Sequence, residues 1–436
     1  MLARFPRLGE VKTRIASELG DEAAKDLHDR LARHTLRRLL ALQACGEARA
    51  EVRTDAAFSG VVREWLGRGP GIRYQGEGDL GRRITLAFAR NFGSRVDKVV
   101  VVGSDCPAMG TRHLRDALAA LESADCVLGP ATDGGYYLVG LRRSASQRAL
   151  RPLFADMPWG STDVLVQTLH AAQRAGVTVS LLEELADVDL PADVVAAEAL
   201  LAAEKIGPTS RISVVVPALD DENLVGTAVR SALAGGAAEV IVADGGSADG
   251  TPQAARNAGA RVVDGPRGRG SQMNAGAAQA TGDVLCFLHA DTVLPHGWAE
   301  SVRAVLAADR AVAAAFDFAV PPGARFSAII EAAGTARWRL TRTPYGDQAI
   351  CVSRSVWEAL GGFPNIPVME DLEFAYRLKR FGRISRVPLP AVTSARVWEQ
   401  HGILRPTLVN AAGIAAYRLG VSPGRIAGWR ERIASR

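Results

Sequence analysis

Carboxylates follow three short apolar runs between Arg211 and Thr292. The runs, 212–216, 240–243 and 284–288, are bounded by turn residues and rich in β-branched or bulky side chains, which is typical of strands buried in a parallel sheet. Ligands of open α/β sheets bind just beyond the carboxyl ends of the strands. We therefore expect six acidic residues to surround one crevice: Asp220, Asp221, Glu222, Asp244, Asp249 and Asp291.

A cluster of this kind repels itself unless it is neutralised. A bound cation, or hydrogen bonds from a sugar or a nucleobase, would neutralise it. The acidic residues therefore predict a ligand of this chemistry at the sheet edge.

A Gly-rich segment, residues 266–283, opens a predicted helix of small residues. It contains four polar side chains that we expect to face the ligand: Arg267, Arg269, Gln272 and Asn274. A flexible backbone with two guanidinium groups suits a diphosphate. A mobile surface loop is the alternative interpretation.

Glu370 and Asp371 begin a predicted amphipathic helix in the segment VMEDLEFAYRLKRFG. An acidic side chain at a helix start is stabilised by the helix dipole. Asp371 could therefore have only this structural role.

The second half of the chain resembles a family 2 glycosyltransferase with the nucleotide-sugar-binding GT-A fold. The family's Asp-Gly-x-Ser-x-Asp-Gly-Thr pattern is present at 244–251, and Asp221-Glu222 takes the place of its Asn-Glu pair. The usual Asp-x-Asp reads His289-Ala290-Asp291, so an imidazole replaces the first acidic ligand. The resemblance implies an inverting transfer of sugar from a nucleoside-diphosphate sugar to a small-molecule or lipid acceptor, with Mg or Mn as cofactor.

The same resemblance implies roles for individual residues. Glu370 and Asp371 would be the catalytic pair, with Asp371 as the base that accepts the proton of the acceptor. Asp291 would hold the metal ion with His289, and His401, after the last strand-like segment, would be a further ligand. The donor would be bound by Asp221, Glu222, Asp244, Ser247, Asp249, Arg267, Arg269, Gln272, Asn274, Asp347 and Gln348.

The resemblance extends to a subgroup linked with arsenosugar-type biosynthesis. Looser similarity points to glycosylation of carotenoids or other lipids. The sequence does not choose between these acceptors.

The first half carries a second set of charged residues on predicted loops. Lys12 and Arg14 lie on a glycine-containing loop before a predicted helix, where backbone donors, the helix dipole and two cations could meet a phosphate. A solvated basic turn is the alternative. Asp105 follows a predicted buried strand at 99–102, and Asp133 lies in a Gly-flanked loop. Each is a candidate ligand or a turn residue.

Five segments of this half resemble a large, mostly uncharacterised family related to the nucleotidyltransferases that make the molybdenum and deazaflavin cofactors. They are RLGEVKTRI, QGEGDLGRRI, VVVVGSDCP, GPATDGGYYLVGL and MPWGSTDVLVQTL. The resemblance implies a second nucleotide site, formed by Lys12, Arg14, Asp79, Arg83, Asp105 and Asp133.

Only residues 1–5 precede the phosphate loop, where this family has a full strand. We therefore expect a truncated first strand that leaves Lys12 and Arg14 on an unpaired sheet edge. Two expectations follow: either the native chain begins upstream of Met1, or the first half binds nucleotides poorly and serves as a scaffold.

The length and composition predict two domains. A chain of 436 residues with 48% hydrophobic residues is too long for one ordinary core. We expect domains at 1–205 and 212–436, joined by a linker at 206–211. The predicted fold class is α/β, with two GT-A-like, Rossmann-like nucleotide-binding domains in tandem, each with a mostly parallel sheet.

Charge and cysteine content indicate which binding partners and which cellular compartment to expect. A formal charge of +5 suits an anionic ligand or a membrane surface, but the basic residues are dispersed and not interleaved with aromatics, so we expect no nucleic acid. Five cysteines without a Cys-x-x-Cys pair fit a reducing compartment, and we expect Cys106 to be simply buried. The apolar span 403–421 is interrupted by arginines and a proline, so we expect that it does not cross a membrane. We therefore predict a cytoplasmic protein, with peripheral membrane association left open.

Three functions remain open from the sequence. The second half alone could be a transferase. The first half could also make the activated sugar by nucleotidyl transfer, which would give a bifunctional chain. In the third hypothesis, the first half is not an enzyme and only docks the second half of the chain to a partner.

Overall fold

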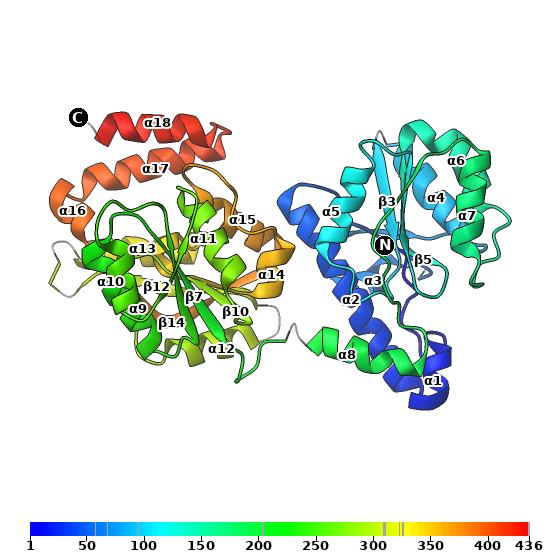
Figure 1. The fold of residues 1–436 in the computed structure, drawn as a ribbon, viewed down its shortest axis with the longest axis horizontal. Helices are drawn as coiled ribbons and strands as arrows, with labels where there is room; N and C mark the ends of the chain where they lie inside the picture. Colours follow the sequence, from blue (N-terminus) through cyan, green and yellow to red (C-terminus); the bar gives the residue numbers. More distant parts are fainter. Residues whose placement is uncertain are drawn as a thin grey trace. The chain divides into compact units, whose positions relative to one another are not determined.

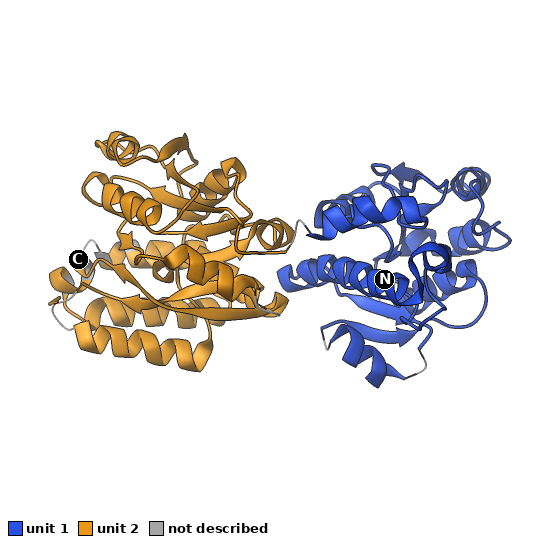
Figure 2. Ribbon diagram, turned by 90° about the horizontal axis from the view of Figure 1, so that it is seen from below, with its two compact units in different colours: residues 1–203 blue, residues 204–436 orange. Residues whose placement is uncertain are grey.

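The chain folds into two compact units, residues 1–203 and 204–436 (Figure 2). The computed structural model describes all residues except 57, 68, 95, 203–204, 308–310, 322, 325–326 and 435–436, together with the side chains of 397, 401, 431 and 434. Both units have an α/β fold (Figure 1). The division falls beside the predicted linker.

The first unit is built on two sheets. Its strands are β1 (Glu51–Thr54), β2 (Gly71–Tyr74), β3 (Lys98–Val102), β4 (Cys126–Pro130), β5 (Tyr136–Arg142) and β6 (Val179–Leu181). β1 and β2 pair in parallel, whereas the larger sheet has the order β3-β5-β4-β6, with β5 antiparallel to both neighbours. The predicted strand at 99–102 is confirmed as β3.

The first three residues of the chain lie between these two sheets. The backbone N–H of Leu2 donates to the carbonyl of Val102 in β3, and that of Ala3 donates to the carbonyl of Arg53 in β1. A single bridge, Leu2 to Arg53, pairs this segment with β1. The start of the chain therefore connects the two sheets.

Helices cover both faces of the larger sheet of the first unit (Figure 1). The helices of this unit are α1 (Thr13–Leu19), α2 (Asp21–Cys45), α3 (Ser59–Leu66), α4 (Leu80–Phe92), α5 (Thr111–Ala120), α6 (Ser146–Phe154), α7 (Val164–Arg174) and α8 (Val194–Ala202), with 3-10 turns at Arg143–Ala145 and Pro191–Asp193. Val102 packs with α2 and α5, whereas its neighbour Val101 packs with α4, α6 and α7. This alternation along β3 produces two apolar cores, one on each face.

The second unit contains one eight-stranded sheet. Its strands are β7 (Ile212–Ala218), β8 (Glu239–Asp244), β9 (Arg261–Asp264), β10 (Val284–Phe287), β11 (Thr292–Val293), β12 (Ala311–Ala319), β13 (Ile350–Ser353) and β14 (Arg383–Thr393). The order is β11-β14-β12-β13-β10-β7-β8-β9, and the last four strands are parallel. The three strands predicted from the sequence are confirmed as β7, β8 and β10. Because they are neighbours, their carboxyl ends share one edge.

Helices also lie on both faces of the sheet of the second unit. The helices of this unit are α9 (Glu222–Ala234), α10 (Thr251–Asn257), α11 (Arg269–Gln279), α12 (Trp298–Ala307), α13 (Ser327–Thr341), α14 (Arg354–Ala359), α15 (Glu370–Phe381), α16 (Arg396–His401), α17 (Leu404–Arg418) and α18 (Pro423–Ala434), with a 3-10 turn at Gly346–Gln348. Val214 and Val216 pack with α9, α10 and α12. Val215 faces α11, whose Gly276 lies so close that a Cβ there would be 2.5 Å from a Val215 methyl carbon. The small residue lets α11 lie directly on the sheet.

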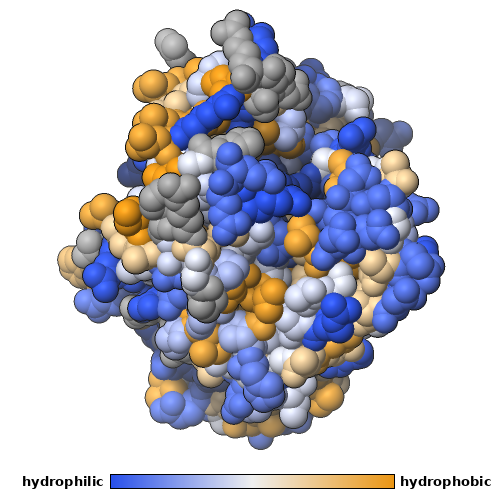
Figure 3. All heavy atoms as spheres, turned by 90° about the vertical axis from the view of Figure 1, so that its left-hand side faces the viewer, coloured by the Kyte–Doolittle hydropathy of each residue, from blue (hydrophilic) through white to orange (hydrophobic). Residues whose placement is uncertain are grey.

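The surface carries scattered apolar side chains. One face of the molecule shows hydrophobic groups among hydrophilic ones (Figure 3). Leu404 and Leu408 of α17 and Leu419 just after it are strongly exposed. None of the described helices has the length and apolar character needed to cross a membrane.

Candidate functional sites

The loops that follow β7 and β8 are cross-linked by hydrogen bonds. The N–H of Asp220 donates to the hydroxyl of Ser247 (3.0 Å), and its carboxylate accepts from the N–H of Ala248 (2.8 Å). The N–H of Glu222 donates to the carboxylate of Asp249 (3.2 Å). The acidic residues predicted to gather at this edge therefore lie side by side.

Asp244 and Asp221 are the more enclosed carboxylates of this edge. Asp244 is buried and accepts from the N–H groups of Gly246 and Ser247, both at 3.1 Å, and from the Ser247 hydroxyl. Burial raises the pKa of Asp221, and the charge of Asp291 adds to the shift. Asp291 at the end of β10 thus belongs to the same electrostatic environment.

Gln272 of α11 connects the ends of β7 and β8. Its amide nitrogen donates to the carbonyls of Ala218 (2.8 Å) and Ala243 (2.9 Å), and the side chain is buried. Both donor hydrogens of the amide are therefore used within the protein. This arrangement gives Gln272 a structural role at the predicted donor site.

Asn274, two residues further along α11, is also held by the backbone. Its side chain exchanges two hydrogen bonds with Phe363, accepting from the N–H (2.9 Å) and donating to the carbonyl (2.8 Å). Arg267 and Arg269 remain exposed at the start of α11. These two guanidinium groups, rather than the two amides, are the side chains of this segment that are open to a ligand.

Asp371 and His289 meet at Gly346. The carboxylate of Asp371 accepts from the N–H of Gly346 (2.8 Å) and from that of Leu372 (2.7 Å). A Cβ on Gly346 would lie 2.3 Å from Nε2 of His289 and 3.3 Å from the Asp371 carboxylate. Glycine is therefore required for this close approach, and the predicted base lies beside the predicted metal-binding strand end.

The imidazole of His289 is neutral at physiological pH. Burial and, to a smaller extent, the charge of Arg269 lower its pKa to about 4, against the opposing effect of Asp291 and Asp371. A neutral imidazole has a free lone pair, so it can accept a hydrogen bond or bind a metal ion.

Asp347 carries an unsatisfied oxygen near the same position. Burial raises its pKa to about 6; the Arg337 guanidinium opposes this shift, whereas Asp371 and Asp291 reinforce it. Oδ1 of Asp347 is buried without a hydrogen-bond partner. An orphaned carboxylate oxygen among other carboxylates fits a divalent cation.

Gln348 fixes the turn that carries Asp347. The side chain is 1% exposed; its oxygen accepts from Arg337 (2.7 Å) and its nitrogen donates to the carbonyl of Phe316 (2.9 Å). The guanidinium of Arg337 lies 3.5 Å from the ring centre of Tyr345. Gln348 thus positions the turn from within the protein.

The predicted metal ligands are only partly described. Asp291 lies within 3.3 Å of the Thr292 hydroxyl and 3.5 Å of that of Thr393. The side chain of His401 lies outside the described residues. In the described parts of the chain, no third ligand atom of the His, Cys, Asp or Glu type joins a compact group at Asp291. The ligand set there remains a prediction.

Glu370 gives a stability prediction. Burial raises its pKa from 4.5 to about 7, and the Asp371 charge adds to the shift. The folded state therefore binds this proton more tightly than the unfolded state, and stability falls as the pH rises from 4.5 through 7. We expect Glu370→Gln to gain on the order of 2 kcal/mol over the wild type between pH 5 and pH 8. Denaturant melts of both proteins with a chelator present measure this difference, and a pH-independent difference would contradict it.

The first unit contains a cavity of about 640 Å³. Its lining includes all six residues predicted from the sequence: Lys12, Arg14, Asp79, Arg83, Asp105 and Asp133. The loops after β3 and β4 and the segment before α1 supply three of these side chains, and α1 and the start of α4 supply the other three. The structure thus brings the predicted set together around one space.

Lys12 is anchored in the interior of this site. Its ammonium group lies 2.9 Å from Asp105 and 3.0 Å from Asp189, and it also donates to the carbonyl of Val188 (2.6 Å). The side chain is only 6% exposed. The prediction that Lys12 hangs from an unpaired sheet edge is therefore wrong, because residues 1–3 pair on both sides and two carboxylates hold the amine.

The other predicted residues of the first unit have looser positions. Arg14 is largely exposed, 3.9 Å from Asp189. Asp79 caps α4 by accepting from the N–H of Arg82 (2.8 Å), so it has at least this structural role. Arg83 lines the cavity, and its Nε is buried without a partner.

Two carboxylates of this site were not identified from the sequence, Asp187 and Asp189. They lie on the segment that follows β6, and both line the cavity. Burial raises the pKa of Asp187 to about 6, and the charges of Asp133 and Asp189 add to the shift. The Asp-x-Asp spacing in LADVDLP, after an apolar run, was the available signal.

Cys106, beside Asp105, behaves as expected. It is buried, its thiol donates to the carbonyl of Ala186, and burial raises its pKa to about 12. A thiol with such a pKa is not a nucleophile at neutral pH.

Lys12→Met is expected to destabilise the first unit. It leaves Asp105 and Asp189 without their shared cation; because both carboxylates are about 40% exposed, we expect a loss of about 2 kcal/mol, less than for a fully buried pair. Thermal and denaturant melts measure it. Arg14→Met is the matched control, since an exposed pair contributes about 0–1 kcal/mol. Equal stability of the two variants would contradict the anchoring role of Lys12.

Each unit matches a different protein family. Residues 213–348 match the family described as Glycosyl transferase family 2, and residues 21–161 match one described as an uncharacterized protein conserved in bacteria, DUF2064. The predicted resemblance of the second half to family 2 glycosyltransferases is thereby confirmed.

Individual relatives are similar over shorter stretches. Glucosyl-3-phosphoglycerate synthases from Mycolicibacterium paratuberculosis and Mycolicibacterium smegmatis are 38% identical over 108 residues and 37% identical over 107 residues. Each match covers 22% of this chain, and 32% and 35% of the two relatives, so the chain spans about a third of the length of these curated proteins.

Solved structures are similar as well. A glucosyl-3-phosphoglycerate synthase from Mycobacterium tuberculosis, solved in complex with Mn²⁺, uridine diphosphate and glucosyl-3-phosphoglycerate, is 25% identical, with a TM-score of 0.33, over 44% of this chain and 74% of that chain.

Proposed function

We propose that the second unit is a glycosyltransferase that moves a sugar from a nucleoside-diphosphate sugar to an acceptor hydroxyl, with inversion at the anomeric carbon. The observation that carries the proposal is the match of residues 213–348 to Glycosyl transferase family 2, because this range contains the strands whose ends carry the carboxylates. Ligand binding at such strand ends is the general rule for open α/β sheets.

Three parts of the site have distinct tasks in this mechanism. Asp371 accepts the proton of the acceptor hydroxyl as that oxygen attacks the sugar. The cross-linked loops after β7 and β8 orient the nucleoside, and the exposed Arg267 and Arg269 bind the diphosphate. Proximity of base and donor converts the transfer into an effectively intramolecular step.

Asp291 would hold a Mg or Mn ion, with the neutral imidazole of His289 and the orphaned oxygen of Asp347 as neighbouring candidates. When bound, such an ion neutralises negative charge on the departing diphosphate. The excess of carboxylates at this position supports the assignment.

The acceptor is the least constrained part of the proposal. The names of the two curated relatives make phosphoglycerate the first small acceptor to test. An arsenosugar precursor and a lipid alcohol at a membrane surface are the alternatives. The exposed leucines of α17 are the apolar side chains that would favour a lipid.

Product formation by the full-length protein tests the proposal. Nucleoside diphosphate release is measured with a panel of nucleotide sugars, each with Mn²⁺ or Mg²⁺ and with phosphoglycerate or a lipid alcohol. The Asp371→Asn variant, in which transfer should be strongly reduced, provides the background rate (the blank). The proposal fails if no nucleotide sugar binds and no acceptor promotes release above the blank.

A second candidate function belongs to the first unit. The cavity there gathers basic and acidic side chains in the same space, which favours nucleotidyl transfer over a purely docking role. Incubating the full-length protein with sugar phosphates and nucleoside triphosphates tests it through pyrophosphate release. A protein that binds no nucleoside triphosphate at this cavity would support the scaffold alternative.

A further inference from the structure

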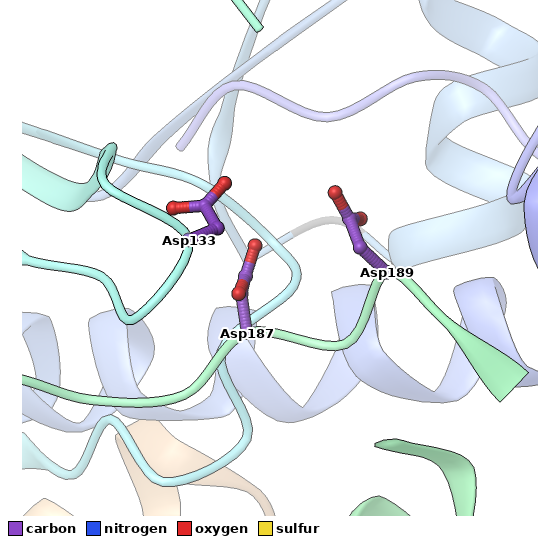
Figure 4. A group of neighbouring side chains, drawn as sticks. All are labelled: Asp133, Asp187 and Asp189. Carbon is purple, nitrogen blue, oxygen red and sulfur yellow. The ribbon is translucent and has the colours of Figure 1, made fainter. Parts of the chain in front are cut away.

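Three carboxylates that line the cavity of the first unit lie close together. Asp133 comes from the loop between β4 and β5, and Asp187 and Asp189 come from the segment after β6 (Figure 4). Each offers one carboxylate oxygen, and the three oxygens lie within 4.8 Å of one another. Oxygen ligands at this spacing can share one hard divalent cation.

The charges at this position do not balance. Asp105 adds a fourth carboxylate, 2.9 Å from the ammonium of Lys12. Among the described residues, the cations paired with this group are Lys12 and the exposed, distant Arg14. One buried ammonium cannot neutralise four carboxylates, so the site has an excess of negative charge.

A second observation, independent of the carboxylates, indicates a ligand in the cavity. Gln75, which follows β2, is 3% exposed and lines the cavity, and its amide nitrogen has no hydrogen-bond partner. The indole nitrogen of Trp159 lines the same space and is also buried and unpaired. A buried donor without a partner lowers stability. A ligand with acceptor groups would satisfy both donors.

We propose that Asp133, Asp187 and Asp189 bind a divalent metal ion, and that this ion holds the phosphates of a nucleoside triphosphate in the adjoining cavity. A cavity of about 640 Å³ matches a ligand of this size. Lys12 and Arg83 supply further positive charge for phosphates. The two unpaired donors suit the polar edge of a nucleobase.

This site is separate from the one proposed for glycosyl transfer. It uses residues of the first unit alone, and its failure would leave the proposal for the second unit untouched. It deepens the second candidate function by naming its metal ligands, two of which lie outside the six residues predicted from the sequence.

Titration of the full-length protein with Mn²⁺ alone tests the metal site. Electron paramagnetic resonance reports the free ion, so the bound ion is obtained by difference. We expect Asp187→Asn and Asp133→Asn each to weaken one class of bound Mn²⁺ by about tenfold or more, since each removes one charged oxygen ligand. Asp116→Asn is the matched control, an exposed carboxylate of α5 in the same unit.

The same titration separates the two units. Asp291→Ala should keep the Mn²⁺ class that Asp187→Asn loses. Lys12→Met should bind Mn²⁺ at this site more tightly than the wild type, because it removes the competing ammonium. If Asp187→Asn and Asp133→Asn bind Mn²⁺ as the wild type does, these carboxylates are not ligands of the ion and the proposal is overturned.

Equilibrium dialysis with each of the four ribonucleoside triphosphates tests the ligand. We expect at least one to bind about tenfold more tightly with Mn²⁺ than with a chelator, and this gain to be absent in Asp187→Asn. Gln75→Leu should lower nucleotide affinity while leaving Mn²⁺ affinity unchanged. Binding of Mn²⁺ without binding of any nucleotide would overturn the ligand assignment. Melting curves of each variant establish that it is folded before either titration.

Discussion

Asp371→Asn is expected to lower the turnover of glycosyl transfer by about two to four orders of magnitude, the usual contribution of a positioned base. An amide of the same shape can still accept from the N–H of Gly346, so the turn beside His289 should keep its geometry. Donor affinity should therefore stay close to that of the wild type. Steady-state rates at saturating substrates and titration calorimetry with the donor measure the two quantities.

Glu370→Gln is the matched control for this experiment. It changes the neighbouring carboxyl by the same chemistry, but burial raises the pKa of Glu370 to about 7, so much of it is already uncharged at neutral pH. Its effect on turnover should be much smaller. A variant at Asp371 that keeps wild-type turnover would remove this residue from the mechanism.

Asp291→Ala is expected to abolish metal-dependent donor binding, whereas His289→Ala should weaken it less. A carboxylate oxygen is the ligand that Mg²⁺ and Mn²⁺ prefer, and an imidazole is optional for either ion. We expect a loss of about 100-fold or more for the aspartate, because loss of a ligand should exceed the roughly 10- to 100-fold loss typical of an outer-shell partner. Donor affinity measured with Mn²⁺ and again with a chelator isolates the metal-dependent part.

Asp317→Asn provides the control for a lost carboxylate in the same unit, since Asp317 pairs with Arg386 on the surface. It should bind donor as the wild type does. An equal loss of metal-dependent donor affinity in Asp291→Ala and His289→Ala would indicate that His289 contributes as much to metal binding as Asp291 does.

The arrangement of the second unit followed closely from its sequence. Short β-branched runs bounded by turns gave β7, β8 and β10, because buried parallel strands leave no polar face that would blur the pattern. The strand ends then placed Asp221, Asp244 and Asp291 at one edge. The pattern of neighbouring residues in the sequence was therefore sufficient to predict these strands and the acidic edge.

The structural roles of the Gln272 and Asn274 side chains could not be predicted from the local sequence pattern. Asn274 is satisfied by Phe363, a residue 89 positions away, and Gln272 by the ends of two strands. Such contacts depend on how distant segments pack, and a single sequence carries no sign of them. Both residues therefore looked like open ligand contacts.

The first unit was harder to predict for a related reason. Asp187 and Asp189 reach the cavity because the segment after β6 runs beside the loop after β4, through a bridge between Leu185 and Ala131. The same packing captures Lys12 between Asp105 and Asp189. The sequence motifs therefore predicted six residues that line the cavity, but not the ion pairs of Lys12 with Asp105 and Asp189.

The cross-linked loops after β7 and β8 also determine the thermodynamic character of donor binding. Since Asp220 already donates to Ser247, and Glu222 already donates to Asp249, few backbone torsions there are left to freeze. Ordering a loop on binding costs roughly 1–2 kcal/mol per residue in conformational entropy, and this loss is largely avoided. Calorimetry should therefore record a modest entropic penalty for the nucleoside moiety, and hydrogen exchange of these loops should change little when the donor is added.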